Sequence, residues 1–333
     1  MKAIVFTGPN QVEMRDVPVP QVKEGWALIK VSHAGICGSD LTIYLGAHPR
    51  AKAPLIMGHE FSGYLEQDIP GMKKGTLVTV DPLLSCGHCT PCKEGNSHVC
   101  STLGLLGIDC DGGMAEYAIA PIDMIVPVPE GVSPKLGAFI EPIAVTVHAI
   151  RMADFLPGSN ALVFGAGTIG LATAITLRRF GAMSITICEP NPVRLEIAKS
   201  LGFHCLQSGD GLLEKLLEES GGEGYDYVFD CAGHQSVADI LPDVVKIRGK
   251  IEIVAGYKKP PMMNYQKGMF REFSIQFTRV YRFSDFQVAA KLAKEEPLYE
   301  RLINYELPPE EAKKGFELLT TPTDAVKVMY CFD

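Results

Sequence analysis

The sequence predicts an α/β protein of two domains, in which a mostly-β domain precedes a parallel β-sheet covered by helices on both faces. Three observations predict this class. The chain has 333 residues, 47% of them hydrophobic, which is enough for two cores, because one core rarely grows past about 250–300 residues. Short β-type runs bounded by Gly and Pro dominate the first ~145 residues. From Ala144 onward, apolar runs alternate with helical stretches.

The strands expected in the first domain are short and joined by long loops. They lie at Lys2–Phe6, Trp26–His33, Thr76–Val80, Glu116–Ala120 and Met124–Val126. In the second domain, continuous apolar strands alternate with helices, which is typical of a doubly wound parallel sheet. Its strands are expected at Ala161–Phe164, Ser184–Cys188, Tyr225–Asp230, Lys250–Ala255 and Phe273–Phe277, with helices at about Thr168–Phe180 and Pro192–Leu201. A last helix (Pro309–Leu319) and strand (Ala325–Cys331) are expected to return to the first domain.

Charge and hydropathy exclude several classes of function. The net charge is −8, and the sequence has no basic stripe for phosphates, so no nucleic-acid partner is expected. Charged residues or Pro break the longest apolar stretches well before the ~20 residues needed to cross a bilayer, so no membrane span is expected. Residues 1–9 lack the basic and apolar regions of a signal peptide. The expected location is therefore cytoplasmic.

A glycine-rich turn predicts a dinucleotide site of the Rossmann type. Its candidate cofactor-binding residues are Gly165, Gly167, Thr168, Ile169, Gly170, Glu189 and Arg194. The pattern G-x-G-x-x-G follows an apolar strand and opens a helix, so the pyrophosphate would meet the positive helix N-terminus. Glu189 ends the next strand, where a carboxylate would bind the ribose hydroxyls and repel a 2′-phosphate, which favours NAD over NADP. The alternative is a glycine-rich turn without a ligand.

Four cysteines in fifteen residues predict a metal site. They are Cys86, Cys89, Cys92 and Cys100. Disulfides are not expected in a reducing compartment, and four thiolates suit a closed, structural zinc site. The alternatives are an iron–sulfur cluster or idle thiols. His88 and His98 lie in the same lobe and are expected to face solvent, because the cysteines already supply four ligands.

A second, dispersed group of residues could hold a catalytic zinc. Cys37 lies among glycines, His59 and Glu60 are adjacent, and Glu141 precedes the cofactor domain. One Cys, one His and one or two Glu would leave a coordination position open for water or substrate. Structural roles for these residues are the alternative. The remaining cysteines are expected to be small buried apolar side chains: Cys110, Cys188, Cys205, Cys231 and Cys331.

On these residues the sequence resembles the zinc-containing medium-chain dehydrogenase/reductase family, in particular its sorbitol (polyol) dehydrogenase-like members. The resemblance runs from Met1 almost to the C-terminus. Its carriers are Gly35–Leu41 (GICGSDL), Gly58–Gly63 (GHEFSG), the four-cysteine lobe, Asp111–Tyr117 (DGGMAEY), Glu141-Pro142 and the glycine turn.

The resemblance implies a GroES-like catalytic domain at 1–145 with a structural-zinc lobe at 86–100, a Rossmann NAD-binding domain at 146–287, and a C-terminal return at 288–333. It implies two zinc ions per chain, the catalytic one surrounded by Cys37, His59, Glu60 and Glu141. Asp40 would orient the His59 ring, and Ser39 would accept the alcohol proton. A homodimer or homotetramer is also implied.

The sequence departs from the family pattern at the substrate end. Thr42 stands where many relatives have a proton-relay His, and His48 is a hypothetical substitute. Val280 precedes Tyr281 where polyol relatives have an Arg-Tyr pair. Four cations could favour an anionic substrate, although ordinary surface charge is the alternative for each: Arg50, Lys52, Arg279 and Arg282. Tyr44 is a candidate pocket wall or a core residue.

The expected activity is hydride transfer from a polyol or related secondary alcohol to NAD, which gives the ketone. The alternatives within the same chemistry are a sugar-acid, hexitol-phosphate, threonine or butanediol dehydrogenase. The alternative of another class is a non-catalytic NAD-binding protein.

Overall fold

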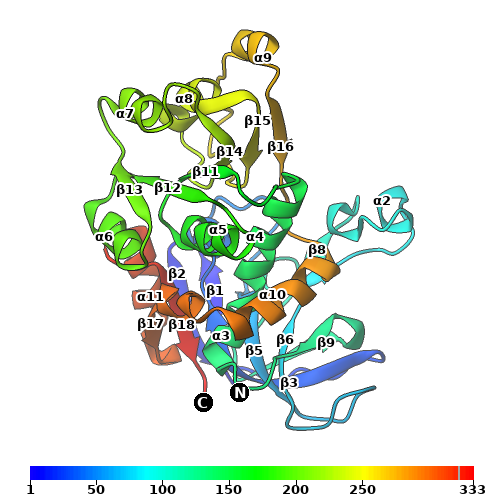
Figure 1. Cartoon of the computed structure of the whole chain (residues 1–333). Helices are drawn as coiled ribbons and strands as arrows, with labels where there is room; N and C mark the ends of the chain where they lie inside the picture. The colour runs from blue at the N-terminus through cyan, green and yellow to red at the C-terminus, as the bar shows by residue number, and fades with distance from the viewer. Residues whose placement is uncertain (322) are drawn as a thin grey trace. The chain divides into compact units, whose positions relative to one another are not determined.

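The computed structural model describes residues 1–321 and 323–333. The chain forms two compact units, the first made of Met1–Ala144 and Arg282–Asp333 and the second of Val145–Tyr281. Figure 1 colours them along the chain, the second unit from green to orange. The first division falls one residue before the expected position. The second falls at Tyr281 and not inside α10 (Phe283–Glu295), because α10 packs as a whole into the first unit, where its Phe286 and Ala289 are fully buried.

The first unit is built mainly from strands. They are β1 (Lys2–Gly8), β2 (Gln11–Asp16), β3 (Trp26–Gly35), β4 (Leu55–Ile56), β5 (Glu60–Leu65), β6 (Leu77–Val80), β7 (Leu83–Leu84), β8 (Gly104–Leu105), β9 (Tyr117–Pro121), β10 (Ile125–Pro127), β17 (Ile303–Leu307) and β18 (Lys327–Cys331). Its helices, 3-10 turns included, are α1 (Gly38–Tyr44), α2 (Thr90–Lys93), η1 (Ser97–Val99), η2 (Ile122–Met124), α3 (Pro134–Ala138), η3 (Pro297–Leu302), η4 (Pro309–Glu311) and α11 (Ala312–Thr320).

A mixed sheet forms the centre of the first unit. Its strands run in the order β10-β6-β5-β3-β18-β17, and β9 also pairs with β3. Two smaller sheets have the orders β2-β1-β4 and β7-β8. The C-terminal half of the long strand β3, from Val31 to Gly35, is buried throughout, and this part of β3 pairs with both β5 and β18. The C-terminal strand β18 pairs antiparallel with β3, so the tail of the chain completes the sheet that begins the domain.

The second unit is a six-stranded parallel sheet in the order β13-β12-β11-β14-β15-β16. Its strands are β11 (Asn160–Phe164), β12 (Ser184–Glu189), β13 (His204–Gln207), β14 (Tyr225–Asp230), β15 (Val245–Ile253) and β16 (Ser274–Phe277). Its helices are α5 (Thr168–Arg179), α6 (Pro192–Ser200), α7 (Leu212–Glu219), α8 (Gln235–Val244) and α9 (Tyr265–Arg271), and α4 (Ile140–Met152) crosses the division between the units. Numbered from β11, this order is 3-2-1-4-5-6, the dinucleotide-binding arrangement.

Burial explains why the parallel strands carry no polar alternation. Ala161, Leu162, Val163 and Phe164 of β11 are all fully buried, as expected for a central strand with helices on both faces. The expected fold class, a mostly-β domain with a Rossmann domain, is therefore confirmed. Among the described residues, no helix is both long and apolar enough to cross a membrane.

Candidate active site

The Cys37 loop is fixed by the junction of β3 and α1. Cys37 is the N-cap residue of α1, and its backbone N–H donates to the Asp40 carboxylate at 2.8 Å. This acidic side chain in the first turn also stabilises the helix N-terminus. The Cys37 thiol is thus held at the start of a helix, directly after a strand of the central sheet.

The neighbouring strand β5 brings His59 and Glu60 to the same place. Glu60 pairs with Gly35 across β3 and β5, so the residues after Gly35 and before Glu60 lie side by side. Gly58 has φ +94°, and a Cβ there would lie 2.7 Å from the Cγ of Met114. Only glycine fits this turn, which delivers His59 to the site.

Three of the four expected zinc ligands come together. The Sγ of Cys37, a ring nitrogen of His59 and a carboxylate oxygen of Glu60 all lie within 4.8 Å of one another. Glu141, buried at the start of α4, lies outside that tight group but is close enough to His59 to raise its pKa. The donor set of sulfur, nitrogen and oxygen suits zinc.

The His59 ring is oriented by polar groups at both nitrogens. Its Nε2 lies 3.4 Å from the Ser39 Oγ, and its Nδ1 lies 3.7 Å from the Oδ1 of Asp40. Both Nδ1 and Oδ1 are buried without a hydrogen bond. A ligand at Nε2 would strengthen the Nδ1–H as a donor to Asp40, as metal-bound imidazoles usually require. The residues present therefore fit a metal ion.

The electrostatics of the site also favour a cation. Burial raises the pKa of the Asp40 carboxyl. Burial opposes protonation of His59, but the nearby Asp40, Cys37 and Glu141 outweigh it and raise the His59 pKa well above its usual value. The enclosed acidic groups thus attract positive charge to the position where a metal would sit.

Lys327 is a site residue that the sequence reasoning missed. Its side chain is 1% exposed, and its ammonium group forms an ion pair with the buried Glu60 and donates to the Ile36 carbonyl at 2.9 Å. A Cβ on Gly35 would lie 2.4 Å from the Glu60 Oε2 and 2.9 Å from the Lys327 Cε, so this glycine leaves room for the pair. A lysine between Val326 and Val328 in an otherwise apolar strand is the signal that could have found it.

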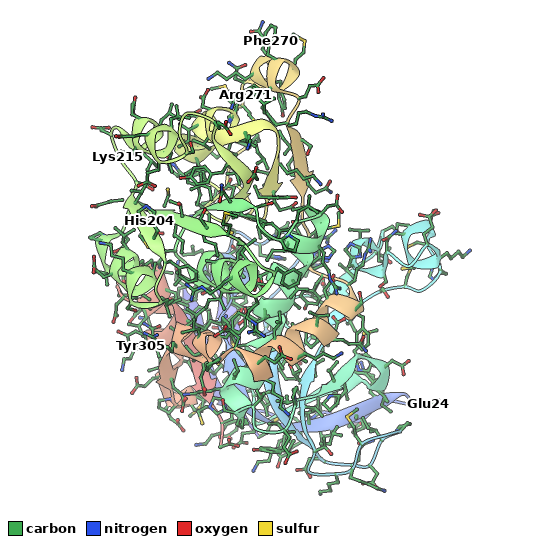
Figure 2. All side chains as sticks on the ribbon, in the orientation of Figure 1. Glu24, His204, Lys215, Phe270, Arg271 and Tyr305 are labelled. Atoms are coloured by element: carbon green, nitrogen blue, oxygen red, sulfur yellow. The ribbon has the colours of Figure 1, made fainter. Side chains whose placement is uncertain are left out.

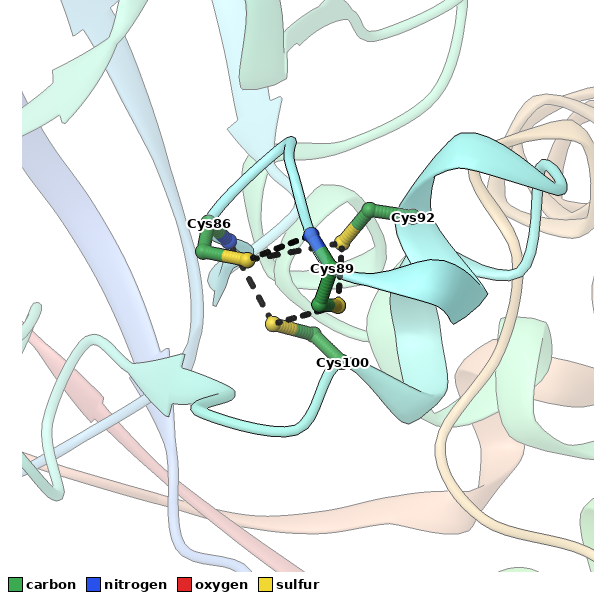
Figure 3. A group of neighbouring side chains, drawn as sticks. All are labelled: Cys86, Cys89, Cys92 and Cys100. Carbon is green, nitrogen blue, oxygen red and sulfur yellow. Dashed lines mark hydrogen bonds between the residues drawn. The ribbon is translucent and has the colours of Figure 1, made fainter.

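The four-cysteine lobe forms a compact sulfur cluster (Figure 3). The Sγ atom of Cys89 lies 3.4 Å from that of Cys92 and 3.8 Å from that of Cys100, and Cys86 lies 4.0 Å from Cys92. Four sulfurs at about 2.3 Å from a tetrahedral zinc lie about 3.8 Å apart. The observed distances match this value, so the lobe fits a closed zinc site.

Backbone N–H groups donate hydrogen bonds to the sulfurs of the lobe. N–H groups of Ser101 and Cys92 lower the pKa of the Cys89 thiol to about 5. The N–H of Cys86 also donates to the Cys100 sulfur at 3.3 Å. Backbone donors thus favour the thiolates of Cys86 and Cys89, which a metal requires, whereas burial raises the pKa of the Cys92 thiol to about 12.

The two histidines of the lobe differ. His88 is exposed, as expected, and its Nδ1 lies 2.7 Å from the Cys86 carbonyl oxygen. His98 is buried, so the expectation that it faces solvent is wrong. It lies in η1, which turns the chain back so that Cys100 reaches the other sulfurs, and this turn carries the ring inward.

The glycine turn of the second unit lines a cavity of about 490 Å³ at the carboxyl ends of β11 and β12. Gly165 has φ +98°, and a Cβ on Gly170 would lie 1.9 Å from the Gly165 carbonyl oxygen. Gly167 is the N-cap of α5, whose first turn contains Thr168 and Ile169. The cavity is lined by Gly165, Gly167, Glu189, Pro190, Arg194 and nine other residues of the second unit.

Glu189 is buried at the edge of this cavity. It accepts hydrogen bonds from the N–H groups of Ala166 at 2.7 Å and Asn191 at 3.0 Å. The carboxylate therefore connects the glycine turn to the start of α6, and it remains part of the cavity wall. Arg194, in the first turn of α6, lines the same cavity.

Several residues expected near the substrate have other partners. Arg50 donates to the Leu103 carbonyl at 2.6 Å and pairs with Asp109 at 3.2 Å. Arg282 donates to the Asn96 side chain at 2.8 Å. These arginines hold the lobe region, which argues against a shared anion site.

The other substrate-end residues are fixed within the fold. Tyr44 is buried and stacks on Phe316 at 4.9 Å, so it is a core residue. Thr42 donates to the Gly38 carbonyl within α1. His48 accepts N–H bonds from Arg50 and Ala51 at its Nδ1, and burial lowers its pKa.

Comparisons with known proteins agree with this geometry. Residues 23–130 match the alcohol dehydrogenase GroES-like domain family, and residues 168–295 match the zinc-binding dehydrogenase family. The chain is 31% identical to the L-threonine 3-dehydrogenase of Bacillus subtilis, over 96% of this chain and 95% of that one. It is also 31% identical to the sorbitol dehydrogenase of Halalkalibacterium halodurans, over 99% and 98%.

A solved structure extends the similarity to three dimensions. The alcohol dehydrogenase rspB of Escherichia coli CFT073, complexed with NADH, has a TM-score of 0.91 and 29% identity, and 99% of each chain is covered. The two domain families together, and each of the two relatives by itself, cover parts of both units described above. The chain therefore belongs to the zinc-binding alcohol dehydrogenase family with a GroES-like domain.

Proposed function

We propose that this dehydrogenase oxidises a polyol or a related secondary alcohol to the ketone with NAD as hydride acceptor. The observation that carries the proposal is the donor group of the half-buried Cys37 and the buried His59 and Glu60, whose ligand atoms all lie within 4.8 Å of one another. One Cys, one His and one or two Glu would leave a coordination position open for water or substrate. The four-cysteine lobe would hold a second zinc ion.

Different residues of the chain are proposed to bind the metal, to orient its ligands and to accept the proton. Cys37, His59, Glu60 and Glu141 would surround the zinc, which when bound supplies Lewis acidity to the substrate oxygen. Asp40 holds the His59 ring from the Nδ1 side. Ser39 is proposed to accept the alcohol proton at its Oγ, which lies on the Nε2 side of the ring. Lys327 pairs with Glu60 and holds it in place.

NAD is proposed to bind at the glycine turn, with Gly165, Gly167, Thr168 and Ile169 facing the pyrophosphate and Gly170 letting α5 pack closely on the turn. Glu189 supports NAD over NADP, because a buried carboxylate in the cavity wall would repel a 2′-phosphate. Arg194 is proposed to contact the adenosine end, since it lines the same cavity.

The substrate test is a panel of secondary alcohols assayed with zinc-replete protein and NAD. The panel contains polyols, sugar acids, hexitol phosphates, L-threonine and 2,3-butanediol, and NADH absorbance is the readout. We expect turnover with at least one polyol and none in the His59→Asn variant. The partners found for Arg50 and Arg282 weigh against phosphorylated or acidic substrates. Turnover of an acidic substrate alone would contradict the polyol assignment.

A non-catalytic NAD-binding protein is the competing proposal of another class. It makes a different prediction for metal content, because such a protein needs no catalytic zinc. We expect two tightly held zinc ions per chain after gel filtration, measured by elemental analysis. One ion or none, together with NAD binding and no turnover, would favour the non-catalytic protein.

Self-association is proposed through the edge of the second unit. Among the residues that the structure describes, β16 is the edge strand of its sheet and pairs with β15 alone, and apolar side chains are exposed on β16 and α9. They are Tyr265, Met269, Phe270 and Phe277, each 67–75% exposed. Figure 2 shows Phe270 projecting from α9. An unprotected apolar edge strand is a template for pairing with a second copy.

Sedimentation equilibrium tests this assembly. We expect a homodimer or a homotetramer for the unmodified chain and a smaller species for Phe277→Asp. The matched control is Leu156→Asp, which is also exposed and in the second unit but outside the patch. A monomeric unmodified chain, or equal effects of both variants, would contradict the proposal.

A cytoplasmic location is proposed from the cysteines. All ten are free, and several lie near enough to another thiol in the lobe to oxidise outside a reducing compartment.

A further inference from the structure

A second mixed cluster of metal-binding side chains lies in the first unit, outside the site described above. His33 of β3, Glu306 of β17 and Cys331 of β18 each offer a ligand atom, and these atoms all lie within 4.8 Å of one another. Cys331 was expected to be a small buried apolar residue. The structure instead places its thiol beside an imidazole and a carboxylate.

Strand register puts the three side chains on one face of the central sheet. Cys331 is directly opposite His33 in the antiparallel pair of β18 and β3. Glu306 is opposite Met329 in the parallel pair of β17 and β18, and Met329 shares its face with Cys331 because side chains alternate along a strand. The cluster is therefore built by three adjacent strands and not by a flexible loop.

The His33 ring is oriented by a short hydrogen-bonded chain. Its Nδ1 lies 2.8 Å from the Ser32 Oγ, and the Ser32 hydroxyl donates to the Asp333 carboxylate. A hydroxyl has one proton. Since that proton goes to Asp333, the Nδ1 of His33 must be the donor to Ser32, and the Nε2 carries a lone pair.

That lone pair faces the other acceptors. The Nε2 lies 3.7 Å from the Glu306 Oε2, beyond a hydrogen bond. His33 is 7% exposed, and burial lowers its pKa despite Glu306 and Asp333, which favours the neutral ring. A buried nitrogen lone pair, a carboxylate and a thiol thus face one point without a positive charge between them.

We propose that His33, Cys331 and Glu306 form a third divalent-metal site, which takes a borderline ion such as Zn²⁺. The imidazole nitrogen and the sulfur select against Mg²⁺ and Ca²⁺, which prefer oxygen ligands. Water completes the fourth position, because Glu306 is 46% exposed and leaves the site open to solvent. Binding displaces the Cys331 thiol proton to solvent, and the Asp333–Ser32 chain fixes the ring as outer-shell partners usually do.

The position of this site gives it a structural consequence. It joins β3, β17 and β18, and β18 also carries Lys327, whose ammonium group holds Glu60 and the Ile36 carbonyl. A metal ion at His33 and Cys331 would fasten the same strand pair near its other end. The ion therefore braces the framework of the catalytic ligands without touching them.

Zinc stoichiometry at a defined free zinc concentration tests the proposal on the full chain. Protein that retains its tightly bound zinc is titrated with Zn²⁺ in a metal buffer, and bound metal is counted after rapid separation. We expect one more ion per chain for the unmodified protein than for Cys331→Ser or His33→Gln. Cys205→Ser, a half-buried cysteine in the second unit, is the matched control and should bind like the unmodified chain. Equal stoichiometry in all four proteins would overturn the proposal.

Alkylation of Cys331 decides the question even if a variant fails to fold. The unmodified protein is treated with iodoacetamide, and each cysteine is quantified by peptide mass spectrometry. Added Zn²⁺ should slow alkylation of Cys331 about tenfold or more, because a metal-bound thiolate is a poor nucleophile, and leave Cys205 unchanged. An unchanged Cys331 rate would overturn the site. Neither readout uses turnover, so loss of this site is distinguishable from failure of the proposed activity.

Discussion

The four-cysteine lobe and the Cys37 site are both groups of metal ligands in the first unit, yet they differ in construction. The lobe takes four identical ligands from fifteen consecutive residues, and three of its four cysteines are only partly buried. The Cys37 site takes different ligands from the start of α1, the start of β5 and α4. Its Asp40, His59 and Glu60 are almost fully buried.

The difference indicates which part depends on the metal. The helix α2 of the lobe has four residues and none buried, so its sulfurs replace a hydrophobic core, as in other small metal-held segments. The Cys37 site instead rests on strand register between β3, β5 and β18. Of these two sites, the closed, local lobe is expected to brace the chain, and the dispersed Cys37 site is proposed to do the chemistry in a frame that is already built.

The largest expected effect is on turnover, at His59. We expect His59→Asn to lower kcat/KM about 10³-fold or more, because the Lewis acid contributes several kcal/mol and each 1.36 kcal/mol is a factor of ten. The bound zinc should fall by one ion, while the unfolding midpoint changes little. Steady-state kinetics, elemental analysis and thermal melts measure the three quantities. A loss of less than tenfold would remove the distinction between the two sites.

The reverse pattern is expected for Cys92. Cys92→Ser should release the lobe zinc and lower the free energy of unfolding by about 2–5 kcal/mol. The fraction of the protein that stays folded should keep its turnover. Urea unfolding measures the loss of stability, and zinc analysis measures the loss of the ion. The control is His88→Ala, an exposed residue of the same lobe, which should keep the zinc. If Cys92→Ser were as stable as His88→Ala, the lobe would not be a metal-dependent brace.

Variants of Lys327 test whether the buried ion pair with Glu60 stabilises the fold around the Cys37 site. Lys327→Met leaves Glu60 buried beside an apolar side chain, and breaking a buried pair on one side costs about 3–5 kcal/mol. Urea unfolding measures this loss. Lys327→Arg should recover part of it, and the double variant with Glu60→Gln most of it. No recovery in the double variant would mean that Lys327 acts through packing and not through Glu60.

The separation of the ligands along the chain decides which of the two sites the sequence can predict. The lobe can be predicted from cysteine spacing, because its ligands are neighbours in the chain. The Cys37 site is readable only through resemblance to a family, since its ligands meet by strand pairing over long separations. The contact of Lys327 was not predicted, because it reaches Ile36 across 291 positions of the sequence. The role proposed for Cys331 was not predicted either, because its partner His33 lies on the first long strand. Register, and not residue type, is what the sequence leaves undetermined.

The smallest expected effect is at Asp81, a buried carboxyl that accepts from a backbone N–H, whereas the buried Glu60 pairs with an ammonium group. Asp81 lies five residues before Cys86, at the end of β6, and burial raises its pKa from 3.8 to about 7 against the Leu83 N–H that it accepts. Between about pH 4 and pH 7 the folded chain therefore binds more protons at this carboxyl than the unfolded chain, so its contribution to stability falls as pH rises through that window.

Asp81→Asn keeps an acceptor for Leu83 and cannot ionise. We expect its unfolding free energy relative to the unmodified chain to rise by about 1–3 kcal/mol from pH 5 to pH 8. Urea unfolding at both pH values measures it. Asp68→Asn, at an exposed carboxylate whose pKa Lys73 lowers, should not show this gain, and a pH-independent difference at Asp81 would mean that the buried carboxyl has a cationic partner after all.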